Sequence, residues 1–130
     1  MAAARILIVD DNPTNLKLVR VLLEGEGHEV RTAADAGEAL AVLEELVPDL
    51  VLMDVQLPGM DGLELTRRIK ADPRTGGVLV VALTAYAMKG DEERILAAGC
   101  DGYVAKPIDT RALPATVAVY LGPSANGGSS

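Results

Sequence analysis

Side chains that could do chemistry stand directly after four of the short apolar runs in this sequence. They are Asp10 and Asp11 after residues 6–9, Asp54 after 50–53, Thr84 after 78–83, and Lys106 after 103–105. In an open sheet of parallel strands, the residues that follow the strands gather at one edge, where ligands bind. Taken singly, each residue could be a helix cap, a strand terminus or a solvated lysine. Taken together, they predict one site that holds acids, a hydroxyl and an ammonium group.

The three acids predict a cation site. At about 4 Å and an effective dielectric near 20, each pair of carboxylates repels by roughly 4 kcal/mol. Oxygen ligands without Cys or His favour a hard ion, and an open site shared with water and phosphate oxygens suits Mg²⁺. A carboxylate beside Mg²⁺ can be a nucleophile that forms an aspartyl-phosphate. We expect Asp54 to be this nucleophile, with Thr84 and Lys106 stabilising the transferred phosphoryl group.

The elements that must position these residues follow from the apolar pattern. Five short runs rich in Val, Ile and Leu lie at residues 6–9, 29–33, 50–53, 78–83 and 103–105. Most are continuous, which is typical of strands covered on both faces, and helical segments between them imply parallel crossovers. The pattern predicts an α/β fold in which one open parallel sheet carries helices on both faces.

Capping signals predict the helix boundaries. Typical helix starts lie at Asn12-Pro13, at Asp35 with Glu38, and at Asp61 with Glu64. The expected helices cover about 13–24, 36–47, 62–71, 91–98 and 109–121. Pro114 would remove a hydrogen bond inside the last helix, so that helix should begin late or kink. Residues 123–130 are small and polar and are expected to form a flexible tail after a domain of residues 1–122.

Composition excludes several classes of protein. The 130 residues carry 12 Lys and Arg against 19 Asp and Glu, a net charge of −7, with three Tyr and no Phe or Trp. The chain therefore lacks the excess of basic residues and the aromatic side chains with which proteins bind nucleic acids, so nucleic-acid binding is disfavoured. The lone Cys100 excludes a disulfide framework and fits a reducing cytoplasm. The apolar runs are much shorter than the about 20 residues that span a bilayer, so no membrane helix is expected.

Four motifs carry a specific resemblance. They are Val-Asp-Asp-Asn at 9–12, Leu-Met-Asp-Val-Gln-Leu-Pro-Gly-Met-Asp-Gly at 52–62, Leu-Thr-Ala at 83–85 and Ala-Lys-Pro at 105–107. Over about residues 5–121 the chain resembles the receiver domain of two-component response regulators, the CheY-like domain. Segments 11–15 and 84–91 resemble stand-alone regulators of the DivK type and the receivers of hybrid kinases. The resemblance implies a flavodoxin-like, doubly wound sheet of five strands in the order 2-1-3-4-5 with five helices.

By this resemblance, Asp54 accepts a phosphoryl group from a phosphohistidine on a sensor histidine kinase or a histidine phosphotransfer protein. Asp11 and Asp54 would bind Mg²⁺ directly, and Asp10 would bind it mainly through water. The backbone carbonyl of Gln56 would complete the protein ligands, and Lys106 would contact the phosphoryl group. The chain would be mainly a signalling switch that catalyses its own Mg²⁺-dependent phosphorylation and dephosphorylation, as a cytoplasmic monomer or weak dimer.

The resemblance also implies residues that switch and tune the site. Thr84 would move toward the phosphoryl group while Tyr103 turns inward, altering the surface of the fourth helix, fifth strand and fifth helix for a downstream protein target. Tyr103 could instead be an ordinary half-buried strand residue. Gln56 and Tyr86 occupy positions that tune loss of the phosphoryl group. Tyr86 would either hinder the attacking water or pack on the fourth helix.

Three alternatives stay open. A phosphohydrolase of the haloacid-dehalogenase type would also use Asp, Thr, Lys and Mg²⁺, but it needs a second acid where this chain has Gln56. A flavin binder would need a loop rich in glycine and hydroxyl groups in place of Asp-Asp-Asn-Pro at 10–13. The chain could also be the receiver fragment of a hybrid histidine kinase. His28 is expected to be a solvated loop residue, not a phosphorelay histidine, and Cys100 a buried structural thiol.

Overall fold

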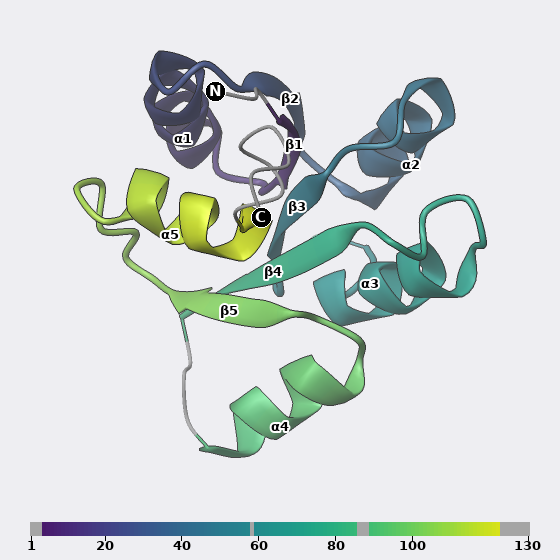
Figure 1. The fold of residues 1–130 in the computed structure, drawn as a ribbon. Coiled ribbons are helices and arrows are strands. Elements are labelled where there is room, and N and C mark those ends of the chain that lie inside the picture. The colour runs from purple at the N-terminus through teal and green to yellow at the C-terminus, as the bar shows by residue number, and fades with distance from the viewer. Residues whose placement is uncertain (1–3, 58, 86–88, 123–130) are drawn as a thin grey trace.

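Strands and helices alternate along the chain, and a computed structural model describes residues 4–57, 59–85 and 89–122 (Figure 1). The strands are β1 (Arg5–Val9), β2 (Glu29–Ala33), β3 (Leu50–Asp54), β4 (Leu79–Thr84) and β5 (Gly102–Ala105). The helices are α1 (Pro13–Gly25), α2 (Ala36–Glu45), α3 (Gly62–Ala71), α4 (Lys89–Ala97) and α5 (Leu113–Leu121). All the strands pair in parallel in the order β2-β1-β3-β4-β5, which confirms the predicted fold class and strand order.

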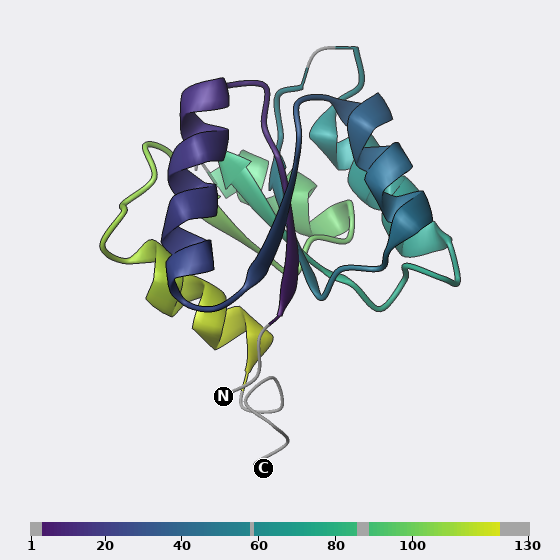
Figure 2. The same cartoon turned by 90° about the horizontal axis from the view of Figure 1, so that it is seen from above.

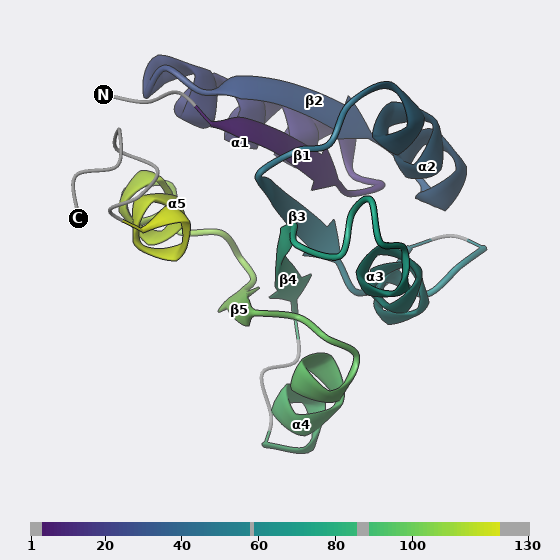
Figure 3. The same cartoon turned by 45° about the vertical axis from the view of Figure 1, so that its right-hand side comes forward.

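Helices cover both faces of the sheet, so the core has two parts. On one face, Ile6 and Ile8 of β1 pack with α1 and α5. On the other face, Leu7 and Val9 pack with residues of α2, α3 and α4. Figures 2 and 3 show α1 and α5 together on one side and α2 and α3 on the other. Strands buried on both faces explain why their sequences are continuous apolar runs.

Strand register brings the predicted site residues to one edge of the sheet. Val9 pairs with Met53, Asp54 with Leu83, and Thr84 with Ala105. The carboxyl ends of these strands therefore lie at nearly the same level of the sheet. The residues that follow or end them, Asp10, Asp54, Thr84 and Lys106, meet at that edge.

Side-chain caps start three of the helices where the sequence predicts. Asn12 Oδ1 accepts the N–H groups of Thr14 and Asn15 at 2.9 and 3.3 Å, with Pro13 in the first turn of α1. Asp35 caps α2 by accepting the N–H of Glu38 at 2.8 Å. Asp61 caps α3 by accepting the N–H of Leu63 at 2.9 Å. These caps supply acceptors for N–H groups that a helix leaves free at its start.

Other boundaries differ from the prediction. Helix α2 ends at Glu45, not at Val47, because Leu46 is extended and the residue before Pro48 avoids the helical region. Helix α4 begins at Lys89, two residues before the predicted start at Asp91.

The last helix begins late, as Pro114 predicts. Helix α5 starts at Leu113 with Pro114 in its first turn, where a missing N–H costs no hydrogen bond. The predicted start near Asp109 is wrong by four residues. Asp109 instead accepts the N–H groups of Arg111 and Ala112 in a separate turn.

Among the helices that the structure describes, none has both the length and the apolar sequence needed to span a membrane.

Candidate functional site

Three carboxylates come together at the carboxyl edge of the sheet. One oxygen from each of Asp10, Asp11 and Asp54 lies within 4.8 Å of the others. Asp10 and Asp54 are buried, at 1% and 4% exposed, whereas Asp11 is exposed. The cluster is an all-oxygen donor set with one side open to solvent, which fits a hard divalent cation that keeps some of its water.

Lys106 supplies positive charge to two of these acids. Its Nζ lies 3.1 Å from Asp54 Oδ2 and 3.6 Å from Asp10 Oδ2. The Lys106 N–H donates to the carbonyl of Thr84 at 2.7 Å, which fixes the lysine to the end of β4. The peptide bond between Lys106 and Pro107 is cis. The ammonium group is thus held between the buried carboxylates.

The environment of Asp54 makes its ionised carboxylate less favourable than in water. Burial raises the pKa of Asp54 above its ordinary value, and the nearby charge of Asp10 raises it further. The N–H of Gln56, which donates to Asp54 Oδ1 at 2.9 Å, and the Lys106 ammonium lower this pKa without cancelling the effect of burial. The site therefore gains from additional positive charge.

Asp10 is held by donors from the start of α1. Its Oδ1 accepts the N–H of Asn12 at 2.9 Å, and its Oδ2 accepts a hydrogen bond from Nδ2 of Asn15 at 3.3 Å. The sequence interpretation missed Asn15. A signal was available, since Asn15 lies in the first turn of the helix that Asn12 caps, five residues after Asp10.

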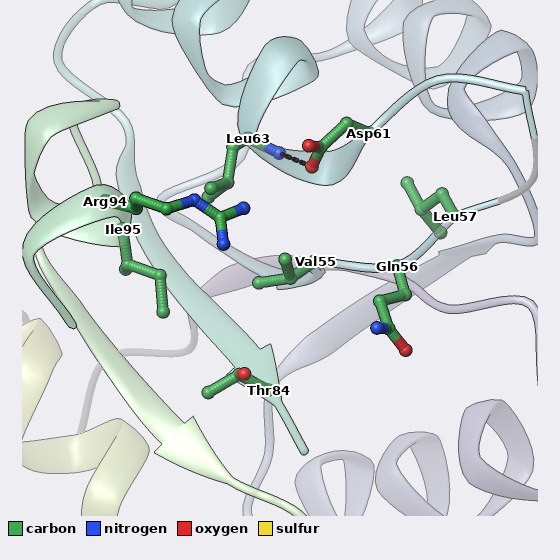
Figure 4. Close-up of a pocket in the computed structure, with 8 residues that line it drawn as sticks. All are labelled: Val55, Gln56, Leu57, Asp61, Leu63, Thr84, Arg94 and Ile95. Carbon is green, nitrogen blue, oxygen red and sulfur yellow. Dashed lines mark hydrogen bonds between the residues drawn. The ribbon is translucent and has the colours of Figure 1, made fainter. Parts of the chain in front are cut away.

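Thr84 and Gln56 lie beside the acids and also line a neighbouring cavity. Thr84 is buried at the end of β4, and the side chain of Gln56 is exposed in the loop after β3. The cavity has a volume of about 490 Å³, and Arg94 from α4 extends into it (Figure 4). Its lining consists of Val55, Gln56, Leu57, Asp61, Leu63, Thr84, Arg94 and Ile95.

Tyr103 links β5 to α4. Its ring is half-buried against the core, and its hydroxyl donates to Glu92 Oε2 at 3.1 Å. The hydrogen bond to this carboxylate raises the pKa of the Tyr103 hydroxyl, and the charge of Glu92 adds to the effect. The other aromatic residue predicted to act at the site, Tyr86, lies outside the described residues.

Gly62 is a further residue that the sequence interpretation missed. A Cβ at this position would lie 2.0 Å from the carbonyl oxygen of Asp54 and 3.0 Å from Cα of Val55. The Gly62 N–H also donates to the Val55 carbonyl at 2.9 Å. The start of α3 is therefore packed directly on the backbone that carries Asp54. The Asp-Gly pair after a proline-containing loop was the available signal.

Two predictions away from the site have different outcomes. Cys100 is buried, as predicted, and burial raises the pKa of its thiol. His28 is half-buried and its Nδ1 accepts the N–H of Ala4 at 3.2 Å, so its prediction as a solvated residue is wrong. The reason is that the turn after α1 folds back on the segment leading into β1.

Comparison with known sequences identifies relatives over nearly the whole chain. The response regulator receiver domain pattern matches residues 6–118. The chain is 46% identical over 117 residues to the polar-differentiation response regulator DivK of Brucella anthropi, covering 90% of this chain and 95% of that protein. DivK of Brucella ovis matches at the same identity and coverage. These matches favour the receiver interpretation over the phosphohydrolase and flavin-binding alternatives.

Solved structures agree with the sequence comparison. A CheY-like receiver domain protein from Methanospirillum hungatei is 36% identical, with a TM-score of 0.86 over 98% of this chain and 100% of that one. The receiver domain of the sensor histidine kinase PA1611 from Pseudomonas aeruginosa, which has a magnesium ion in its active site cleft, is 37% identical, with a TM-score of 0.82 over 92% and 98%. From its motifs, its fold and these similarities, the chain belongs to the response regulator receiver domain family of two-component signalling.

Proposed function

We propose that Asp54 accepts a phosphoryl group from a phosphohistidine on a sensor histidine kinase or a histidine phosphotransfer protein, and that the phosphorylated chain binds a downstream protein target. One observation carries this proposal. A buried carboxylate with Lys106 at 3.1 Å stands in a cluster of acid oxygens within 4.8 Å of one another. Receiver domains in general interact with such donors and targets.

The transfer forms one bond and breaks one. A carboxylate oxygen of Asp54 attacks the phosphorus, the bond from phosphorus to the donor imidazole breaks, and its electron pair stays on the imidazole nitrogen. Lys106 and the Thr84 hydroxyl each stabilise a phosphoryl oxygen. The Gln56 N–H holds the Asp54 carboxylate in a fixed orientation for the attack.

Mg²⁺ is the metal that this donor set fits. Asp11 and Asp54 would hold the ion directly, Asp10 mainly through water, and the backbone carbonyl of Gln56 would complete the set. When bound, the ion supplies positive charge that offsets the repulsion between the carboxylates and the incoming phosphoryl oxygens. Burial and the charge of Asp10 both raise the pKa of Asp54, and a bound cation would counter both effects, which supports this assignment.

Phosphorylation is proposed to change the surface formed by α4, β5 and α5. Thr84 moves toward the phosphoryl group, and Tyr103 turns inward, giving up its hydrogen bond to Glu92 on α4. Gln56 and Tyr86 tune the rate at which water removes the phosphoryl group. The chain then acts as a cytoplasmic signalling switch, a monomer or weak dimer, that catalyses its own Mg²⁺-dependent phosphorylation and dephosphorylation.

Transfer from labelled phosphohistidine tests the proposal. Histidine kinases autophosphorylated with labelled ATP are mixed with the chain in Mg²⁺, beside a second receiver known to accept from each kinase. Label should pass to the chain and be released by hydroxylamine, which cleaves acyl phosphates. Asp54→Asn should take up no label. Transfer to Asp54→Asn at the rate of the parent chain would contradict the assignment of the phosphorylated residue.

A further inference from the structure

Asn15 lies beside the acid cluster without being one of its acids. Its Nδ2 is 3.3 Å from Oδ2 of Asp10, and its side chain is half-buried. The NH₂ group must face the carboxylate, because an amide oxygen in that place would repel it. Asn15 therefore donates a hydrogen bond to a charged acceptor, the stronger kind of hydrogen bond.

Both oxygens of Asp10 are engaged by protein groups. Oδ1 accepts the N–H of Asn12 at 2.9 Å, and Oδ2 faces Asn15 at 3.3 Å and the Lys106 ammonium at 3.6 Å. Asp10 is only 1% exposed, so its orientation depends on these groups more than on solvent. Without the Asn15 amide, Oδ2 would keep only the longer contact with Lys106, and one of the groups that restrain the Asp10 carboxylate would be lost.

The backbone at Asn15 is fixed independently of this contact. Asn12 caps α1 by accepting the Asn15 N–H at 3.3 Å, and Pro13 sets the helix start. The cap uses the backbone of Asn15 and leaves its side chain free to reach Asp10. Alanine favours helix more than asparagine does, so truncating this side chain keeps the helix and removes only the amide.

We propose that Asn15 is a positioning residue for divalent cation binding: its hydrogen bond to Oδ2 restrains the orientation of the Asp10 carboxylate within the acid cluster. The inference rests on the proposed function, since it assumes that the cluster binds Mg²⁺. Groups that orient a metal ligand are typically worth about 10–100-fold in affinity. The bond is long and Asp10 acts mainly through water, so we expect the lower end of that range.

The Mg²⁺ dissociation constant, measured by isothermal titration calorimetry, tests this role in matched variants. Asn15→Ala should bind Mg²⁺ about tenfold more weakly than the parent chain. Thr14→Ala, an exposed position in the same helical turn, should bind as the parent does. Asn15→Leu, which restores the volume but not the N–H donor, should show the same weakening as Asn15→Ala. Thermal unfolding without Mg²⁺ should place all the variants within a few degrees of the parent.

Three outcomes would overturn the inference, and they are distinguishable. Equal Mg²⁺ affinity in the parent chain, Asn15→Ala and Asn15→Leu would overturn the positioning role alone and leave the metal site intact. A parent chain that binds no Mg²⁺ would overturn the proposed function as well. Loss of affinity that tracks a loss of thermal stability in metal-free protein would assign Asn15 a purely structural role.

Discussion

The chemistry proposed for this chain depends on a charge imbalance at one carboxyl group. Asp54 is buried between an acid neighbour and a lysine, and burial leaves its pKa raised in spite of the lysine. Burial makes the ionised form of Asp54 less favourable, and a bound cation would offset this cost. Asp54 should therefore influence stability, metal binding and reactivity together.

Replacing Asp54 should change stability in a pH-dependent way. Because the folded pKa lies above the unfolded value, the folded chain binds more protons, and this group's favourable contribution is present at low pH and lost as the pH rises through the folded pKa. Asp54→Asn cannot ionise, so in metal-free protein it should raise the free energy of unfolding at neutral pH. The gain should shrink as the pH falls through the folded pKa and should be absent below the ordinary Asp pKa of about 3.9. Urea unfolding at several pH values measures it, and a gain independent of pH would refute the prediction.

Removing the lysine should improve metal binding while impairing the response to phosphorylation. Lys106 competes with a cation for Asp54 and Asp10, so Lys106→Met should lower the Mg²⁺ dissociation constant by roughly fivefold, about 1 kcal/mol for a charge in a partly solvated site. Calorimetric titration measures this change. Weaker Mg²⁺ binding in Lys106→Met would mean that the lysine holds the acids in place instead of competing for them.

Residue types predicted much of the site, and their contacts explain what was missed. The acids, Thr84 and Lys106 could be found because each follows an apolar strand. Asn15 and Gly62 were missed because each acts through one tertiary contact, Asn15 with Asp10 and Gly62 with the Asp54 backbone. Composition and periodicity do not predict such contacts. Tyr103 was placed correctly on β5, but its partner Glu92 lies on α4 and follows from no local pattern.

At the scale of elements, the contact between α3 and β3 fixes the backbone of the site. Gly62 begins α3, and a Cβ there would overlap the carbonyl of Asp54. Sequence signals predicted the start of α3 through the Asp61 cap, but not this approach. At two other helix ends a proline shifts the boundary by a few residues, Pro48 at the end of α2 and Pro114 at the start of α5.

Gly62→Ala should therefore destabilise the fold and displace the site. The added methyl group meets backbone and not a flexible side chain, so we expect a loss of about 3 kcal/mol, the upper part of the range for overpacking. Gly37→Ala is the matched control, since its Cβ would meet Asp35 Oδ1 at an ordinary 3.4 Å and should change stability by less than about 0.5 kcal/mol. Denaturant unfolding compares them. Equal stability of the two variants would disprove tight packing of α3 on β3.

At the scale of the whole molecule, strand order and register create the site. Asp10 and Lys106 are far apart in sequence and directly follow β1 and β5, which β3 and β4 separate in the sheet, yet their side chains approach within 3.6 Å. The apolar pattern predicted five parallel strands, but the order 2-1-3-4-5 came from resemblance to a family. Periodicity could not supply it, because several crossover arrangements bury the same apolar faces equally well.

A ligand that binds where strands from the whole sheet meet should stabilise the whole fold. Mg²⁺ at about 100 times its dissociation constant should raise the free energy of unfolding by about 2.7 kcal/mol, provided that it binds only the folded chain. Asp11→Asn should lose most of this gain, whereas Glu93→Gln, an equal change of charge on the exposed surface of α4, should keep it. Thermal unfolding with and without Mg²⁺ gives the comparison. Full stabilisation of Asp11→Asn would remove Asp11 from the metal ligands.

The most direct test of the central claim is the intact mass of the chain after incubation with Mg²⁺ and a small acyl phosphate. The proposed chemistry predicts the addition of one phosphoryl group to the parent chain, none to Asp54→Asn, and none to the parent chain when a chelator removes the Mg²⁺. An unchanged mass for the parent chain, or the same addition to Asp54→Asn, would contradict phosphorylation at Asp54.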